Sequence, residues 1–217
     1  MPHITVDGSR LARIDIFARR DWQMSPGDRA ALEGVLCALS PGLSIEVGTA
    51  RGGSLARMAA HSETVHTFDL ERPPELPPNA AFHRGDSRGT LPAALAELDR
   101  NVDFALVDGE HTEAAVAADL GSLLDSPRVQ RAVILAHDSF HPPVRAGIEA
   151  AAGHEKVTHA DLDFVPGRMT KGGVFADQPS GGFGVLLVGI EAPRIEVGDA
   201  VLEFHPAARP RKRLLRR

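Results

Sequence analysis

The stretch of residues 43–54, with the sequence LSIEVGTARGGS, constrains the fold of this chain most. An apolar run of strand length leads to three glycines, Gly48, Gly52 and Gly53, and then to a helix-like segment at 54–61. This order predicts a strand, a tight turn and the start of a helix. Glycines let the backbone of such a turn approach a ligand closely, and the first N–H groups of the helix can donate to an anion. We therefore expect a nucleotide-like ligand at this turn.

Two familiar phosphate-binding loops do not match this turn. A P-loop, with the pattern GxxxxGK[ST], needs a lysine where Ser54 stands. A dinucleotide fingerprint, GxGxxG, needs a second glycine where Ala50 stands. What remains is an acid on the strand, Glu46, which can accept hydrogen bonds from an ammonium group or a ribose. The alternative is an ordinary strand-to-helix turn with a buried acid.

Further along the chain, strand-like apolar runs end in polar residues. The runs at 64–69, 80–87, 102–108 and 131–139 alternate with helical patterns at 25–39, 54–61, 91–98, 112–124 and 144–152, and two last strands are expected at 156–164 and 183–190. Such alternation is typical of a parallel sheet with helices on both faces. Because the carboxyl ends of parallel strands meet at one edge, these polar strand ends predict one site. They are Asp69, Asp86, Ser87, Asp108, His137 and Asp138.

Composition narrows the function class. The 217 residues fit one domain with a substantial core. A net charge of −5 argues against a nucleic-acid-coating surface and favours a small-molecule partner. The single Cys37 fits a reducing compartment, and there is no run of 18 apolar residues that would suggest a membrane span. We expect a cytoplasmic protein without membrane or nucleic-acid partners; whether it forms a homo-oligomer is left open.

The chain resembles the class I S-adenosylmethionine-dependent methyltransferases. The resemblance rests on ExGTxxGxS at 46–54, DGxH at 108–111, and His137-Asp138 after the fifth strand. More closely, the chain is similar to the branch of small-molecule and sugar O-methyltransferases related to macrocin O-methyltransferase and to the cephalosporin-hydroxylase methyltransferase component. Together with the strand pattern, the resemblance implies a Rossmann-like, doubly wound, mostly parallel seven-stranded sheet with an antiparallel last strand, in three α/β/α layers.

The resemblance also implies a division of the chain and a cofactor. Residues 1–24 would form an N-terminal cap or lid, 25–205 the methyltransferase domain, and 206–217 a tail in which six basic residues lie. The cofactor would be S-adenosylmethionine, with the methionine part near Glu46 and Gly48, the ribose at Asp69, and the adenine near Asp86 and Ser87. The full set of residues implied to contact the cofactor is Glu46, Gly48, Thr49, Ser54, Asp69, Asp86, Ser87 and Asp108.

Catalysis is expected just beyond the fourth and fifth strands. Relatives commonly hold a divalent cation at the positions of Asp108 and Asp138, but they usually carry a second carboxylate where this chain has His137. A histidine ligand weakens a Mg²⁺ site or favours Mn²⁺ or another transition ion, so the need for a metal stays open. Glu110 or His111 would take the proton of the acceptor hydroxyl. Each has an alternative interpretation, as a helix-start acid and as a helix-start residue bonded to backbone.

Three functions follow from these features. The first is O-methylation of a hydroxyl on a small molecule, such as a sugar or a glycosylated natural product. The second is a non-catalytic accessory protein that binds S-adenosylmethionine with the same fold; His137 favours it slightly. The third, an NAD-dependent oxidoreductase, is weakened by the missing second glycine of the dinucleotide fingerprint.

Overall fold

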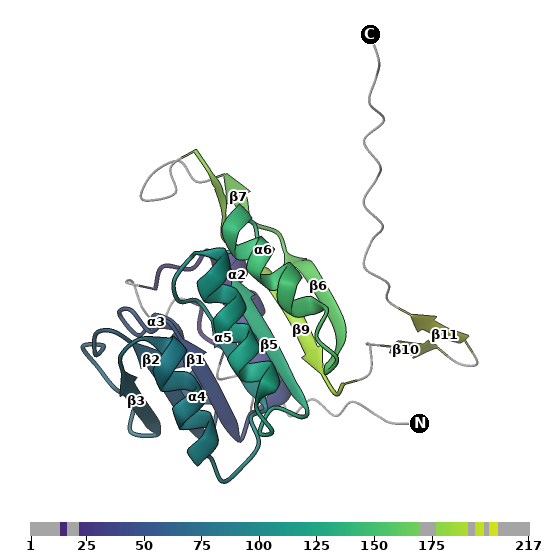
Figure 1. The fold of residues 1–217 in the computed structure, drawn as a ribbon. Helices are drawn as coiled ribbons and strands as arrows, with labels where there is room; N and C mark the ends of the chain where they lie inside the picture. Colours follow the sequence, from purple (N-terminus) through teal and green to yellow (C-terminus); the bar gives the residue numbers. More distant parts are fainter. Residues whose placement is uncertain (1–13, 17–21, 170–176, 191–193, 198–199, 204–217) are drawn as a thin grey trace.

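The computed structural model describes residues 14–16, 22–169, 177–190, 194–197 and 200–203 (Figure 1). The helices are α2 (Pro26–Leu39), α3 (Gly53–His61), α4 (Ser87–Glu97), α5 (Glu113–Asp125) and α6 (Pro142–Ala152). The main strands are β1 (Leu43–Val47), β2 (Thr64–Asp69), β3 (Ala80–Arg84), β4 (Phe104–Val107), β5 (Ala132–His137), β6 (Val157–Val165) and β9 (Phe183–Val188). Shorter strands are β7 (Arg168–Met169), β8 (Pro179–Ser180), β10 (Arg194–Val197) and β11 (Ala200–Glu203).

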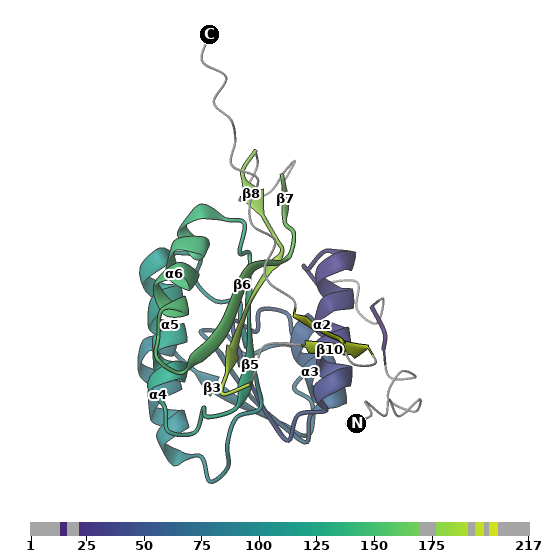
Figure 2. The ribbon, with the colours of Figure 1, turned by 90° about the vertical axis from the view of Figure 1, so that its right-hand side faces the viewer.

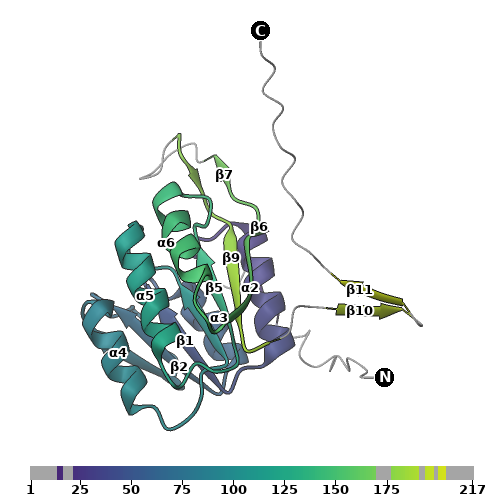
Figure 3. The ribbon, with the colours of Figure 1, turned by 45° about the vertical axis from the view of Figure 1, so that its right-hand side comes forward.

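The seven main strands form one sheet in the order β3-β2-β1-β4-β5-β9-β6. The pairs that join β3, β2, β1, β4 and β5 are parallel, whereas β9 lies antiparallel between β5 and β6 (Figure 3). The strand order reverses at β1, where β2 and β4 flank it. This is the predicted doubly wound sheet with its antiparallel last strand, and the prediction is confirmed.

Helices cover both faces of the sheet, as predicted. Helices α4, α5 and α6 lie on one face, and α2 and α3 lie on the other (Figure 2). Alternate strand residues supply the two cores: Ile45 and Val47 belong to one apolar cluster, and Phe104 and Leu106 belong to the other, where Leu36 of α2 also packs. Burial on both faces explains why the central strands are continuous apolar runs rather than alternating ones.

Helix α2 begins as its sequence predicts. The Ser25 hydroxyl accepts the Asp28 N–H at 3.2 Å, and the Asp28 carboxylate accepts the Ser25 N–H at 2.9 Å. This capping box satisfies two backbone groups at the helix start, with Pro26 at the first helical position. The helix therefore starts at a fixed place directly above the sheet, which matters for the site described below.

Helix α4 starts earlier than the sequence pattern indicated. The expected strand at 80–87 ends at Arg84, and the helix expected from residue 91 begins at Ser87. The physical reason is the side chain of Asp86, which accepts the Arg88 N–H at 2.9 Å and so acts as the N-cap. Asp86 and Ser87 therefore belong to a helix start and not to a strand end.

Parts of the expected domain division lie outside the described residues. The tail at 206–217 is outside them, and of the cap segment at 1–24 only 14–16 and 22–24 are described. Near the C-terminus, β10 and β11 form an antiparallel pair, and residues 198–199 between them are not described. The short pair β7 and β8 was not expected. Among the described helices, none has the length and apolarity needed to cross a membrane.

Candidate active site

A cavity of about 770 Å³ opens at the carboxyl ends of the central strands. Its walls come from the turn after β1, the ends of β2, β4 and β5, and the start of α4. Two further walls come from residues 22–25 before α2 and from residues 166–168 and 180–182 around β9. The cavity thus lies at the topological switch point, where open α/β sheets bind their ligands. Of the twelve predicted site residues, all except Glu46 line it.

The glycine turn after β1 forms the floor of the cavity. Gly48 has a φ of 88°, and a side chain there would collide with the Asp108 carbonyl group at the end of β4. Only glycine lets the two strand ends lie this close. The Asp69 carboxylate accepts the N–H groups of Thr49 and Ala50, both at 2.8 Å. Asp69 therefore orders the turn as well as facing the cavity.

Glu46 lies below the floor instead of lining the cavity. Its side chain is fully buried, the Ser54 hydroxyl donates to one carboxylate oxygen, and the Thr67 hydroxyl donates to the other, each at 2.6 Å. Burial raises the pKa of Glu46 to about 7, in spite of the two hydroxyl donors. Glu46 joins β1 to the first turn of α3 and to β2, so it supports the turn from beneath.

Asp86 and Ser87 lie at the edge of the cavity that α4 forms. The Asp86 carboxylate is half exposed and is paired with the Arg88 guanidinium at 2.6 Å. An exposed pair of this kind contributes little to stability. Turning the Asp86 carboxylate toward a ligand would therefore cost little in the ion pair, but it would also give up the cap of α4.

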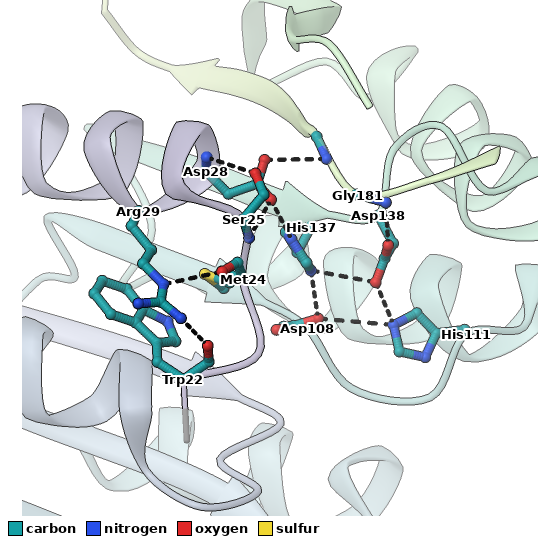
Figure 4. A network of polar contacts seen from close by, with 11 residues as sticks. Trp22, Met24, Ser25, Asp28, Arg29, Asp108, His111, His137, Asp138 and Gly181 are labelled. Atoms are coloured by element: carbon teal, nitrogen blue, oxygen red, sulfur yellow. Dashed lines mark hydrogen bonds and ion pairs between the residues drawn. The ribbon is translucent and has the colours of Figure 1, made fainter. Parts of the chain in front are cut away.

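An Asp–His cluster closes the opposite end of the cavity (Figure 4). Nδ1 of His137 lies 3.0 Å from an oxygen of Asp108 and 3.2 Å from an oxygen of Asp138. Nε2 of His111 lies 2.9 Å from the same Asp138 oxygen and 3.7 Å from Asp108. The structure thus brings together four residues that the sequence placed after two different strands.

The backbone of the cluster is held in an unusual conformation. Asp138 has a φ of 56°, in the left-handed region that few non-glycine residues adopt. The Gly181 N–H donates to its second carboxylate oxygen. Such conformations persist where the surroundings fix them, and they concentrate at functional sites.

Charge explains the titration behaviour of the cluster. Burial opposes a charge on His137, but the carboxylates of Asp108, Asp138 and Asp28 prevail and hold its pKa well above the usual value. Hydrogen bonds to Asp108 and Asp138 raise the pKa of His111 to about 9. Burial works against the charge of Asp138, yet contacts with the two histidines hold its pKa well below the usual range. The two charged histidines thus offset much of the negative charge of the three carboxylates.

Asp28 is a member of the cluster that sequence reasoning missed. One of its carboxylate oxygens lies 3.4 Å from Nε2 of His137, and the other accepts the Gly182 N–H at 3.2 Å. In the sequence, Asp28 is fully accounted for by the capping box of α2. Its contact with a residue 109 positions away has no local signal.

The segment before α2 covers part of the cavity. Trp22 is almost fully buried, and its side chain packs on the backbone of Gly53 at the start of α3. The Arg29 guanidinium lies 4.9 Å above the Trp22 ring and donates to the carbonyl groups of Trp22, Met24 and Ile16. Arg29 thereby ties this segment to the second turn of α2.

Glu110 and His111 differ in their surroundings. Glu110 is exposed at the cavity wall, where one carboxylate oxygen accepts the Thr112 hydroxyl at 3.2 Å. His111 is partly buried in the cluster, and its high pKa leaves it charged at neutral pH. A charged imidazole has no nitrogen lone pair that can accept a proton. Of the two residues, Glu110 is therefore the better candidate for the base.

The donor set of the cluster fits a divalent cation. One ligand atom each from Asp108, His137 and Asp138 lies within 4.8 Å of the others. The second nitrogen of His137 faces a carboxylate, the outer contact that metal-binding histidines usually make. Two carboxylates with one imidazole suit Mn²⁺ or another transition ion better than Mg²⁺, which prefers oxygen ligands.

Known proteins share the domain and the fold described above. Residues 45–139 match a family model described as a methyltransferase domain. No curated protein matches the sequence significantly. Three solved structures resemble the chain, and each match covers 85% of it. TomG, an O-methyltransferase from Streptomyces achromogenes, is 19% identical with a TM-score of 0.59, and 91% of its chain is covered. An O-methyltransferase from Bacillus cereus is 18% identical with a TM-score of 0.58 and 92% coverage of its chain, and CalS11, a TDP-rhamnose 3'-O-methyltransferase, is 18% identical with a TM-score of 0.53 and 88% coverage of its chain.

Residues 45–139 thus match a methyltransferase domain, and the fold is that of solved O-methyltransferases, as the sequence predicted. At under 20% identity, the three solved structures establish the fold and leave the acceptor open.

Proposed function

We propose that the protein is an S-adenosylmethionine-dependent O-methyltransferase that acts on a hydroxyl group of a small molecule, such as a sugar or a glycosylated natural product. The observation that supports this most is the cavity, with a glycine turn and Asp69 at one end and the Asp–His cluster at the other. The TomG structure holds SAM, and the Bacillus cereus enzyme holds SAH. CalS11 is a sugar O-methyltransferase by its name.

The cofactor would lie over the turn at 48–50, with its ribose at Asp69 and its adenine beside Asp86 and Ser87. The second carboxylate oxygen of Asp69 accepts the Glu71 N–H in a long hydrogen bond of 3.3 Å. That oxygen can accept from a ribose hydroxyl while the other holds the turn. Glu46 would act from beneath, by holding Ser54 and Thr67 in place.

Methyl transfer needs an acceptor oxygen in line with the sulfonium methyl group. The oxygen forms a bond to the methyl carbon as the carbon–sulfur bond breaks, S-adenosylhomocysteine leaves, and the hydroxyl proton goes to a base. We assign the proton to the Glu110 carboxylate, with His111 as the rival. A divalent cation held by Asp108, His137 and Asp138 would polarise the acceptor hydroxyl and lower its pKa.

Calorimetric titration tests the proposal. S-adenosylmethionine and NAD are titrated separately, each with and without Mn²⁺ or Mg²⁺, and transfer of a labelled methyl group is then measured on a panel of hydroxylated sugars and glycosides. Binding of S-adenosylmethionine with transfer to any of these acceptors supports the proposal. Binding without transfer favours the non-catalytic accessory protein, and binding of NAD alone contradicts both. Full activity in excess chelator would contradict a role for a metal ion but would leave the proposed methyltransferase activity standing.

A further inference from the structure

The Asp28 carboxylate makes three contacts that meet at one corner of the site. One oxygen accepts the Ser25 N–H at 2.9 Å and faces Nε2 of His137 at 3.4 Å. The other accepts the Gly182 N–H at 3.2 Å. The carboxylate is buried, at 3% exposure. Asp28 therefore joins the start of α2, the end of β5 and the start of β9.

The Gly181–Gly182 turn completes this arrangement. Its two consecutive N–H groups donate to Asp138 and to Asp28, which lie on either side of His137 (Figure 4). Both glycines have positive φ angles, 71° and 77°, and a side chain at Gly182 would collide with the Val165 carbonyl oxygen. The turn thus fixes the two carboxylates at the same time.

The contact with Asp28 decides which way the His137 ring presents its nitrogens. An ionised carboxylate only accepts hydrogen bonds, so the nitrogen that faces Asp28 must carry a proton. Nδ1 faces the carboxylates of Asp108 and Asp138 and carries a proton as well in the charged ring. When that proton is lost and Nε2 keeps its own, the lone pair of Nδ1 is directed at those two acids. This is the tautomer in which Nδ1 can bind a cation held by those two acids.

We propose that Asp28 is a positioning residue, which orients His137 and fixes its tautomer for the catalytic corner. The inference rests on the proposed function, because the cation belongs to that proposal. In this role Asp28 acts on the site through its contact with Nε2 of His137. Its role as a helix cap is the competing explanation, and Ser25 provides a matched control for it.

The test compares four proteins: the unaltered chain, Asp28→Ala, Asp28→Asn and Ser25→Ala. Mn²⁺ affinity is measured by electron paramagnetic resonance. The His137 ring is observed by two-bond ¹H–¹⁵N NMR without metal, at a pH high enough for the ring to be neutral, with His137→Asn identifying its signals. We expect Asp28→Ala to weaken Mn²⁺ binding by about 10- to 100-fold and to change the His137 spectrum. Asp28→Asn should lose less Mn²⁺ affinity than Asp28→Ala, because the amide oxygen of asparagine can still accept a hydrogen bond from Nε2 of His137. Ser25→Ala should lower the melting temperature and leave Mn²⁺ affinity within about twofold, since it removes only the cap.

Two results would overturn the proposal. One is an Asp28→Ala protein with unaltered Mn²⁺ affinity and an unaltered His137 spectrum; the other is a Ser25→Ala protein that loses as much affinity as Asp28→Ala. If Asp28→Ala does not fold, Asp28→Ser replaces it, since its hydroxyl ends one bond short of the carboxylate oxygens. If the unaltered chain binds no Mn²⁺, the metal part of the proposed function fails, and the His137 spectrum alone decides the role of Asp28.

Discussion

Asp69 has two expected roles in the cavity: it orders the turn after β1, and it accepts hydrogen bonds from a ribose. It holds the Thr49 and Ala50 N–H groups and faces the place where a ribose would lie. We expect Asp69→Ala to weaken S-adenosylmethionine binding by about 1–3 kcal/mol, because ribose hydrogen bonds are lost. Calorimetry measures this, with Asp86→Ala as the comparison. Asp86 is half exposed and paired with Arg88, so its loss should matter less. Unchanged affinity in Asp69→Ala would place the ribose elsewhere.

The buried acid Glu46 predicts a pH dependence of stability. Its pKa is about 7 in the folded protein against an ordinary value of 4.5, so between these values the folded state holds a proton that the unfolded state has lost. The stabilisation is complete below about pH 4.5 and is lost as the pH rises through 7, by on the order of a few kcal/mol. Burial lowers the pKa of His66 and of His83, which has the opposite effect on the slope.

The Glu46→Gln variant isolates the contribution of Glu46 to the pH dependence of stability. Both neighbouring hydroxyls can donate or accept, so a glutamine can be accommodated between Ser54 and Thr67. Urea unfolding at pH 5 to 8 should show the unaltered protein losing stability relative to Glu46→Gln as the pH rises. Parallel curves for the two proteins would mean that Glu46 has an ordinary pKa in the fold.

The proton acceptor is decided by comparing Glu110 and His111. Glu110→Gln should leave cofactor affinity intact and lower turnover by roughly a hundredfold or more, the usual contribution of a positioned base. His111→Ala should also leave cofactor binding intact, while turnover falls less. Near-normal turnover in Glu110→Gln beside a large loss in His111→Ala would transfer the role to the histidine. Near-normal turnover in both variants would mean that neither side chain is the base and that the cation alone activates the acceptor hydroxyl.

At the scale of elements, the segment before α2 depends on one side chain of that helix. Arg29 donates to carbonyl groups of Trp22, Met24 and Ile16 and lies over the Trp22 ring. We expect Arg29→Ala to release the segment and raise the KM for the cofactor or the acceptor. Because Trp22 is the only tryptophan and is 4% exposed, its fluorescence should shift to the red.

Arg29→Lys is the matched variant for this test. A lysine keeps the charge but cannot donate to three carbonyl groups in a fixed fork, so only part of the effect should be rescued. An unchanged emission spectrum in Arg29→Ala would show that Trp22 is held by its packing on Gly53 alone.

The elements that sequence predicted well are those with a local cause. The capping box at Ser25 starts α2 where expected, and β4 and the first five residues of β5 are continuous apolar runs because both of their faces are buried. The start of α4 was misplaced, because an acid after an apolar run suits a strand end as well as an N-cap. The two-residue strands β7 and β8 are too short to show any periodicity.

The candidate site was predicted to the extent that it follows strand ends. A parallel sheet brings Asp69, Asp108 and Asp138 to one edge, however the helices pack on its faces. The position of Glu46 below the cavity floor depends on which face of β1 it occupies, and the role of Asp28 depends on how α2 is docked. Contacts of this kind arise from packing between distant segments, which local sequence patterns do not encode.

At the scale of the whole molecule, two segments distant in sequence share one cavity. Residues 22–25 and residues 180–182 both line it, and Asp28 contacts the backbone at the boundary of each. The sheet edge that holds the cofactor turn and the Asp–His cluster is built from β1, β2, β4 and β5. If the proposed function holds, we expect the central strands to carry the reacting groups and the two outer segments to select the acceptor.

Because the cavity joins four strand ends and two outer segments, a ligand that fills it should stabilise the entire fold. S-adenosylhomocysteine at one hundred times its dissociation constant adds about 2.7 kcal/mol to the free energy of unfolding. For a domain of this size, each kcal/mol raises the melting temperature by about 2–4 °C, so we expect a rise of roughly 5–10 °C. Differential scanning calorimetry measures the shift, with NAD at the same concentration as the control ligand and Asp69→Ala as the control protein. NAD should leave the melting temperature unchanged, and the shift should shrink in Asp69→Ala; an equal rise with both ligands, or no rise with either, would contradict a cavity built for S-adenosylmethionine.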